Sequence, residues 1–482
     1  MTHDILIIGG GINGTAIARD AAMNGLSVLL VEKDDLASHT SSASTKLIHG
    51  GLRYLEYYEF KLVREALKER ERLLRTAPHL IYPMLFVLPH QNAVRPWWLV
   101  RLGLWLYDTI GGRISLPKSR GLRAGDTLFR APLKEQSKGF VYSDAWVDDA
   151  RLVVLNAMDS ARHGAEVRTR TGLVSARREG GLWQAELSDG SAVSAKAMVN
   201  AAGPWVAQLL AKAGVNSAAS VRLIKGSHII VDALFEGDQA YMLQQPDRRV
   251  VFAIPYQGNK TLIGTTDEAV EKPEDAVITP AEIDYLCAAA NRYFTPQISP
   301  TDVVATYSGV RPLYDDGASE AKAITRDYVL ELDDNGPPLL SVFGGKITTA
   351  RHLAEEATER LGLGERSVTN QAALPGGDLG SGFEAFLAGV NARWPFLGPD
   401  RARRMARAYG SMLEDMLNGV SGAPGMGTDF GGGLSAVEVD WLVSREWAKS
   451  ADDILTRRTK IGLATGPETV DRLEQYLKGK TT

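Results

Sequence analysis

The sequence predicts an α/β protein of two or three domains, or one large α/β unit with an added domain. Three observations predict this class. The chain has 482 residues, which is longer than one average domain. Two continuous apolar runs, Ile5–Ile8 and Leu26–Val31, flank a glycine-rich turn and a helical segment, as expected for buried parallel strands. Beyond about residue 375 the pattern becomes helical, which predicts a separate α-helical domain.

The composition excludes several classes of protein. A hydrophobic fraction of 44% predicts a folded core, and a net charge of −4 gives no support for nucleic-acid binding. The single cysteine, Cys287, excludes an intrachain disulfide and a cysteine-rich metal site, and we predict no metal site. Cys287 lies in a helical segment and is expected in the core. No apolar run reaches the roughly 18 residues of a transmembrane helix, and the chain opens without a signal peptide.

A glycine fingerprint follows the first strand. Gly9 permits the tight turn, Gly11 allows a pyrophosphate to approach, and Gly14 lets helix and strand pack closely. Glu32 ends the second strand 18 positions after Gly14, close to the roughly 20 expected for an acid that binds a ribose. This unit predicts a dinucleotide site, and the acid favours FAD or NAD over NADP.

Two features favour FAD over NAD. The second strand runs into a long polar loop, 34–56, where an NAD dehydrogenase usually continues into further parallel repeats. Residues 172–200 predict a small meander with Gly-Gly and Asp-Gly turns. Its last strand ends in the small residues before Trp205, which could let a strand end approach the cofactor. A discontinuous FAD domain explains this pattern best.

The chain resembles the FAD-dependent glycerol-3-phosphate dehydrogenases. The resemblance spans nearly the whole chain and rests on IGGGINGTAIARD, TSSASTKLIHGGLRYLE, YSDAWVDDARL, NAAGPWV, RLIKGSHII, IGTTD, YSGVRPL, ITRDY, LLSVFGGKITTARHLAE and EWAKSADDILTRRTKIGL. It implies oxidation of sn-glycerol 3-phosphate to dihydroxyacetone phosphate, with a hydride passing from C2 to N5 of FAD. It also implies that the electrons continue to a membrane quinone and that the chain is a homodimer.

The resemblance also implies roles for individual residues. The substrate-binding residues would be Arg53, Tyr54, Arg311, Arg326 and His228, and the catalytic residues Arg311, His228 and Lys346. Arginine suits a phosphate through its planar fork. The base stays open between His228 and His49. Gly50 and Gly51 would lie against the flavin ring, with Arg53 pointing toward the substrate phosphate. The expected cofactor-binding residues, with FAD held non-covalently, are Gly9, Gly11, Asn13, Gly14, Glu32, Ser42, Ser44, Lys46, His49, Gly50, Gly51, Ala202, Gly203, Trp205, Gly345, Lys346 and Thr348.

The expected architecture has three domains. A glutathione-reductase-like, discontinuous FAD-binding Rossmann domain would comprise residues 1–80, 140–215 and 300–370. An antiparallel-sheet substrate domain would comprise residues 81–139 and 216–299. An α-helical C-terminal domain would occupy residues 375–482, and it could carry the contacts of a dimer.

Residues 95–113 mix tryptophans with arginines. This pattern fits a helix lying in a membrane interface, and it equally fits a buried helix whose tryptophans fill a core. The resemblance favours peripheral membrane contact, so we expect the protein on the cytoplasmic face of a membrane or in the cytoplasm.

Other functions remain open from the sequence. The enzyme could be an oxidase that passes electrons to oxygen and makes peroxide. Amino-acid and hydroxy-acid oxidases share the glycine fingerprint but bind a carboxylate, whereas several arginines here favour a phosphate. The alternative that is not an enzyme is a non-catalytic FAD-binding membrane adaptor.

Overall fold

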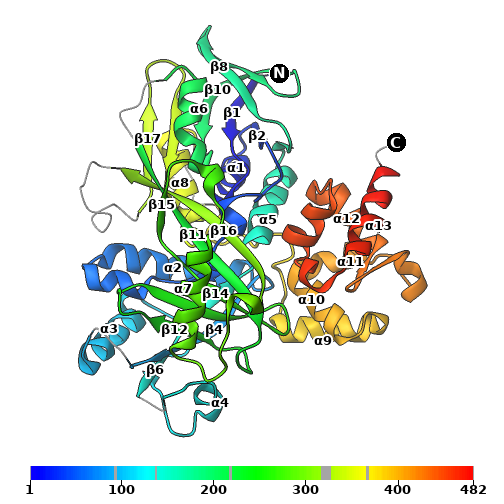
Figure 1. Cartoon of the computed structure of the whole chain (residues 1–482). Helices are drawn as coiled ribbons and strands as arrows, with labels where there is room; N and C mark the ends of the chain where they lie inside the picture. Colours follow the sequence, from blue (N-terminus) through cyan, green and yellow to red (C-terminus); the bar gives the residue numbers. More distant parts are fainter. Residues whose placement is uncertain are drawn as a thin grey trace.

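The computed structural model describes residues 2–91, 95–135, 138–215, 220–315, 327–364 and 368–480. Two β-sheets occupy the upper and lower parts of Figure 1, and the C-terminal helices lie to one side of them. The predicted class, α/β with a largely antiparallel second sheet and a helical C-terminal domain, is confirmed.

The first sheet has a parallel centre. Its strand order is β17-β18-β10-β1-β2-β7, with β17 antiparallel at one edge. The predicted meander is present as β8, β9 and the start of β10, joined by turns at 180–181 and 189–190. The strands are β1 (Thr2–Ile8), β2 (Val28–Val31), β7 (Glu166–Arg168), β8 (Leu173–Glu179), β9 (Leu182–Leu187), β10 (Ala192–Asn200), β17 (Val329–Asp333) and β18 (Leu339–Phe343).

Both faces of this sheet are buried, which explains the continuous apolar run of β1. Ile5 and Ile7 face a core shared with α1 (Ile12–Met23) and α8 (Ala350–Arg360). The alternate residues, Leu6 and Ile8, face the meander and α6 (Val206–Lys212). The alanines of α1 allow α8 and α5 (Asp149–Arg162) to pack closely beside it.

The second sheet is antiparallel apart from the pair β4–β12. Helix α7 (Pro280–Asn291) covers one face and contributes the buried Cys287, as expected. Helices α2 (Phe60–Thr76) and α3 (Trp97–Ile110) cover the other face, while the short α4 (Thr127–Arg130) lies in the loop before β6. The strands are β3 (Leu47–Ile48), β4 (Ile81–Pro89), β5 (Arg120–Gly121), β6 (Gly139–Val147), β11 (Ser220–Asp232), β12 (Ala240–Gln244), β13 (Val250–Tyr256), β14 (Lys260–Gly264), β15 (Glu268–Val270) and β16 (Val303–Asp315).

The sheets divide the chain differently from the predicted boundaries at three places. The short strand β3 (Leu47–Ile48), expected in the FAD-binding domain, pairs with β6 of the second sheet. Residues 140–147 and 303–315, expected in the FAD-binding domain, form strands of the second sheet. The physical reason is strand pairing: β6 pairs with β4 along its whole length, and β16 pairs with β11. A hydrophobic pattern indicates a strand but not the strand beside which it lies.

The C-terminal domain is helical, as predicted. It contains α9 (Phe383–Arg393), α10 (Pro399–Tyr409), α11 (Leu413–Met416), α12 (Ala436–Glu446), α13 (Pro467–Lys478) and a small hairpin of β19 (Asp429–Gly431) and β20 (Leu434–Ser435). Its core is continuous with residues of α5, so it packs directly on the first sheet's helical layer (Figure 1). Among the described residues, no helix has both the length and the apolar character needed to cross a bilayer.

Candidate active site

The turn between β1 and α1 has no room for side chains. Gly9 has φ +116°, and a Cβ on it would lie 2.4 Å from the carbonyl oxygen of Ala201. A Cβ on Gly14 would lie 1.9 Å from the carbonyl oxygen of Gly9, which explains the close packing predicted for this glycine. The N-terminus of α1 therefore stands at the carboxyl edge of the sheet, beside the end of β10. The N–H of Ile12 donates to the Ser41 hydroxyl at 2.9 Å, so an anion here would be held by the other N–H groups of the first turn.

Glu32 fastens the loop after β2 to this turn. Its carboxylate accepts hydrogen bonds from the backbone N–H of Gly10 at 2.6 Å and of Asp34 at 2.9 Å. Burial raises the pKa of the Glu32 carboxyl, and these two N–H donors oppose that effect. Each carboxylate oxygen keeps a lone pair that a ribose hydroxyl could use.

Asn13 joins the same turn to the segment after β18. Its Nδ2 donates to the carbonyl oxygen of Gly344 at 3.0 Å, and a Cβ on Gly345 would lie 2.7 Å from that nitrogen. Its Oδ1 is buried and has no partner among the described residues. An unused buried acceptor beside a helix N-terminus fits a dinucleotide with both phosphates and hydroxyl groups, so the residues present suit FAD.

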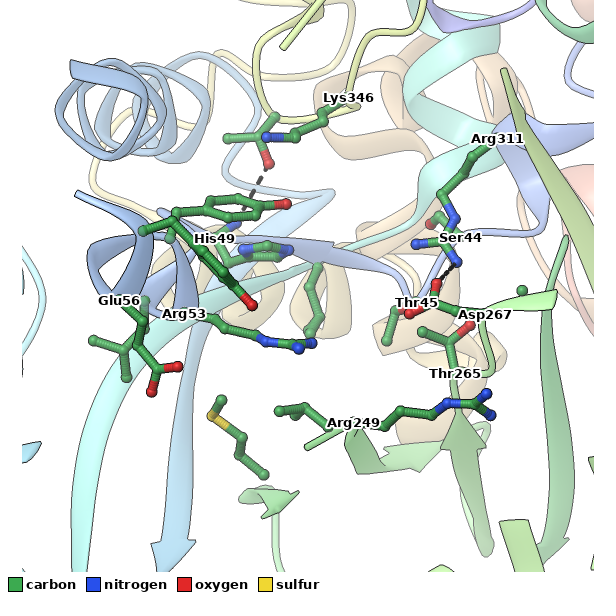
Figure 2. A pocket seen from close by; sticks show the side chains of 18 of the residues that line it. Ser44, Thr45, His49, Arg53, Glu56, Arg249, Thr265, Asp267, Arg311 and Lys346 are labelled. Atoms are coloured by element: carbon green, nitrogen blue, oxygen red, sulfur yellow. Dashed lines mark hydrogen bonds and ion pairs between the residues drawn. The ribbon is translucent and has the colours of Figure 1, made fainter. Parts of the chain in front are cut away.

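We call the glycine turn between β1 and α1, together with Glu32 and Asn13, the dinucleotide cradle. A cavity of about 1160 Å³ opens next to this cradle. Figure 2 shows Lys346 and His49 on one side above Arg53, with Arg311, Ser44 and Thr45 gathered across from them. The walls come from the loop 40–60, from α3, from the paired strands β11 and β16, and from residues 344–348. The predicted site residues that line it are Ser44, His49, Arg53, Tyr54, His228, Arg311, Gly345, Lys346 and Thr348.

Six cationic side chains of the described residues line the cavity wall, and three of them, Arg53, Arg311 and Lys346, are predicted site residues. Arg53 is partly buried and has no ion-pair partner among the described residues. Arg311 pairs with Asp267 and donates to the carbonyl oxygen of Thr266 at 3.2 Å. The ammonium of Lys346 lies 4.2 Å from the centre of the Tyr54 ring. This arrangement suits a small, strongly anionic ligand.

The absence of a side chain at Gly226 makes space for Arg311. Gly226 of β11 stands opposite Gly309 of β16. A Cβ on Gly226 would lie 3.0 Å from Nη2 of Arg311 and 2.6 Å from Oγ1 of Thr265. The guanidinium therefore passes over strand backbone that carries no side chain.

Both histidines of the cavity are neutral near pH 7. Burial, followed by the charges of Lys46 and Arg311, lowers the pKa of His228 to about 3. Its Nε2 lies 3.0 Å from the hydroxyl of Thr45, its ring stacks on Tyr307 at 4.7 Å, and its Nδ1 is buried without a partner among the described residues. Burial also lowers the pKa of His49, whose backbone N–H faces Thr348 Oγ1 at 3.4 Å.

Several predicted cofactor residues have other contacts. Nζ of Lys46 lies against the buried carboxylate of Asp149 at 2.9 Å, outside the cavity wall. The Ser42 hydroxyl donates to the carbonyl oxygen of His39 at 3.2 Å. A Cβ on Gly50 would lie 2.5 Å from Leu67.

The neighbours of Gly50 and Gly51 in the protein explain why both positions are glycine. The backbone N–H of Gly50 donates to the hydroxyl of Tyr107 at 2.7 Å, so its packing partners are helices α2 and α3. Gly51 has φ +75°, and a Cβ there would lie 2.3 Å from the Tyr54 ring. Protein neighbours explain why neither position has room for a side chain, and contact of these glycines with a flavin ring stays a prediction.

The end of β10 leads to Trp205. The indole N–H donates to Glu274 at 2.8 Å, and the ring lies 4.5 Å from His39. Ala202 and Gly203, which has φ +55°, form the turn between Asn200 and this ring. These residues lie beside the loop that follows Glu32.

Arg326 lies outside the described residues.

Sequence reasoning missed several polar side chains of the cavity, among them Thr45, Thr265, Asp267 and Arg249. Thr45 belongs to the same loop as Ser44, and Thr265 and Asp267 belong to the IGTTD segment, so their signals were present without assigned roles. Arg249 lies just after the turn between β12 and β13, where a charged residue usually indicates a solvated surface.

Comparisons with known proteins show the family of this chain. Residues 4–351 match the family described as FAD dependent oxidoreductase, and residues 367–478 match the C-terminal domain of alpha-glycerophosphate oxidase. The chain is 52% identical to a glycerol-3-phosphate dehydrogenase of Pseudomonas aeruginosa, covering 99% of this chain and 95% of the relative. It is 51% identical to a D-erythritol 1-phosphate dehydrogenase of Brucella abortus, covering 95% of this chain and 94% of the relative.

A solved structure shows the same architecture. The glycerol-3-phosphate dehydrogenase of Bacillus halodurans, complexed with FAD, matches with a TM-score of 0.74 at 28% identity, covering 99% of this chain and 94% of the other. The predicted cofactor, FAD, is confirmed. The fold, the cradle and these matches show that the chain is an enzyme of the FAD-dependent oxidoreductase family, with the C-terminal domain found in alpha-glycerophosphate oxidase.

Proposed function

We propose that this enzyme oxidises sn-glycerol 3-phosphate to dihydroxyacetone phosphate. The observation that carries the proposal is the meeting of Arg53, Arg311 and Lys346 at one cavity beside the cradle. A phosphate dianion needs such cations, and the relatives of highest identity include dehydrogenases named for this substrate. When bound, FAD accepts the hydride that leaves C2.

The chain's own residues would bind and orient the substrate. Arg53 and Arg311 would hold the phosphate, with Tyr54 beside them, and Arg326 stays a predicted third arginine. The cation of Lys346 would stabilise negative charge that develops near the reacting centre. Asp267 would fix the Arg311 guanidinium in direction, as it does in the structure.

The proton of the C2 hydroxyl must pass to a base, for which His228 and His49 remain the candidates. His228 lines the cavity as a neutral ring whose Nε2 lies 3.0 Å from the Thr45 hydroxyl while its Nδ1 is buried, so a substrate hydroxyl would have to replace Thr45 as the partner of Nε2. Its lowered pKa makes it a weak acceptor of a full proton until substrate is bound.

We also propose that the electrons leave to a quinone at a membrane surface. Helix α3 buries Leu104 and Tyr107 and exposes 66% of Trp98 and 55% of Trp105. The same helix lines the cavity, and exposed Tyr58 stands across its mouth. An apolar surface at the mouth of a redox site fits a lipid-soluble acceptor. The homodimer stays a prediction.

A product assay tests the proposed reaction. Holoenzyme given glycerol 3-phosphate and a soluble quinone analogue in air is expected to form dihydroxyacetone phosphate with little peroxide. Peroxide in stoichiometric amounts would make the enzyme an oxidase. Turnover of D-erythritol phosphates alone would contradict the proposed substrate, and no turnover with either would favour a non-catalytic FAD-binding protein.

Replacing Trp98 and Trp105 together by serine is expected to reduce sedimentation with anionic liposomes about tenfold or more, because two exposed indoles are lost from the surface. Activity with a water-soluble acceptor should be unchanged. The control variant replaces two exposed valines away from this helix, Val174 and Val304, by serine. Equal sedimentation of all three proteins would contradict this docking surface.

A further inference from the structure

The loop Ser44–Lys46 forms part of the cavity wall and is held in an unusual backbone conformation. Lys46 has φ +59°, a value that a residue with a side chain adopts only when its surroundings enforce it. Tyr307 donates from its hydroxyl to the carbonyl oxygen of Ser44 at 2.8 Å. Between Ser44 and Lys46, Thr45 contacts His228 at 3.0 Å. The loop therefore contacts the His228 ring, which also stacks on Tyr307.

Asp149, the first residue of α5, holds both ends of the loop. Its fully buried carboxylate accepts from the Ser44 hydroxyl at 2.8 Å and from the Lys46 ammonium at 2.9 and 3.0 Å. Burial alone would raise the pKa of Asp149, but Lys46 and Lys460 hold it at about 2. The carboxylate is therefore ionised and depends on its cations.

The second cation comes from the C-terminal domain. Nζ of Lys460 lies 2.7 Å from Asp149 and 2.6 Å from Asp148, and Lys460 is itself buried. Lys460 follows a π-helical turn, Asp453–Arg458, that is anchored separately. Arg458 bonds the Asp35 carboxylate at 2.8 and 2.9 Å and the carbonyl oxygen of Glu446 at 2.8 Å. The segment that carries Lys460 therefore has its own anchors.

We propose that Lys460 is a positioning residue for the active site, through which the C-terminal domain holds Asp149, the loop Ser44–Lys46 and the Thr45–His228 contact in place. The balance of charge supports this role. Lys46 and Lys460 face Asp148 and Asp149, so loss of Lys460 leaves two neighbouring carboxylates with one lysine between them. Two experiments test this role of Lys460. The first needs no substrate, and only the second rests on the proposed function.

The first readout is amide hydrogen exchange of the FAD-bound protein, which needs no substrate. Lys460→Met is expected to raise exchange in residues 42–48 at least about tenfold, because the Asp149 carboxylate that holds the loop loses one of its two cations. The control, Arg404→Met, removes a cation from buried Glu438 within the C-terminal domain, where the pair lies at 2.7 Å. It should leave exchange in 42–48 unchanged. Equal protection of 42–48 in wild type and Lys460→Met would overturn the proposal.

The second readout is a double-mutant cycle on flavin reduction by glycerol 3-phosphate. Lys460→Met and Thr45→Val are each expected to slow reduction about tenfold with FAD bound, and the double variant should be no slower than either. If the double variant reduces its flavin more slowly by the product of the two single effects, the proposed route through Thr45 would be overturned. If Lys460→Met gives no folded holoenzyme, Lys460→Gln, which keeps a donor toward Asp149, takes its place. A wild-type flavin that stays oxidised would contradict the substrate only, and hydrogen exchange would still decide the role of Lys460.

Discussion

Replacing Arg311 by methionine is expected to slow reduction of the flavin by glycerol 3-phosphate at least about 100-fold while the protein stays yellow. Arg311 is positioned over Gly226 and held by Asp267, so its guanidinium faces the cavity without blocking the dinucleotide cradle. Methionine keeps much of the side chain's volume but removes the charge that a phosphate needs. Both the affinity for substrate and the limiting rate of reduction should fall, as measured by anaerobic stopped-flow absorbance.

A matched variant separates this role from a general loss of charge. Arg292→Met removes an exposed arginine beside α7, which packs on the same sheet. It is expected to reduce its flavin as fast as wild type. If Arg311→Met reduces its flavin at the wild-type rate, Arg311 does not belong to the substrate site.

Gly14→Ala is expected to abolish FAD binding. The added Cβ would lie 1.9 Å from the carbonyl oxygen of Gly9, a backbone atom that cannot rotate away. The turn and the N-terminus of α1 would have to move apart, and the pyrophosphate would lose its position. The purified protein should therefore be colourless, as judged by flavin absorbance relative to protein absorbance.

The control for this change is Gly389→Ala, in the middle of α9. A Cβ there meets no atom within 4 Å, and alanine favours a helix. This variant should retain full FAD content and should be at least as stable as wild type. A fully yellow Gly14→Ala protein would contradict the steric reading of the turn.

Local sequence patterns predicted the cradle because its geometry is local. Gly9 and Gly14 meet within one turn, and Glu32 closes the same strand–helix–strand unit. The exposed face of α3 could not be separated from its buried face by composition alone. The structure resolves this because Trp98 and Trp105 point outward while Tyr107 reaches Gly50.

The parts that sequence reasoning missed depend on contacts between distant segments. Lys46 resembled a cofactor ligand because it stands in the polar loop 34–56. Its partner, Asp149, lies 103 positions away in the sequence. Gly50 resembled a contact for a flat ligand, yet it packs on Leu67 and Tyr107. Lys460 stands in EWAKSADDILTRRTKIGL, a segment of the resemblance, but the pattern assigned it no role, since its proposed role depends on how the C-terminal domain packs against α5.

The measurement that tests the account most directly is anaerobic reduction of the purified, FAD-bound protein. Addition of glycerol 3-phosphate is expected to bleach the flavin band, and a quinone analogue added afterwards is expected to restore it. A flavin that stays oxidised with glycerol 3-phosphate, but bleaches with a chemical reductant, would contradict the proposed substrate.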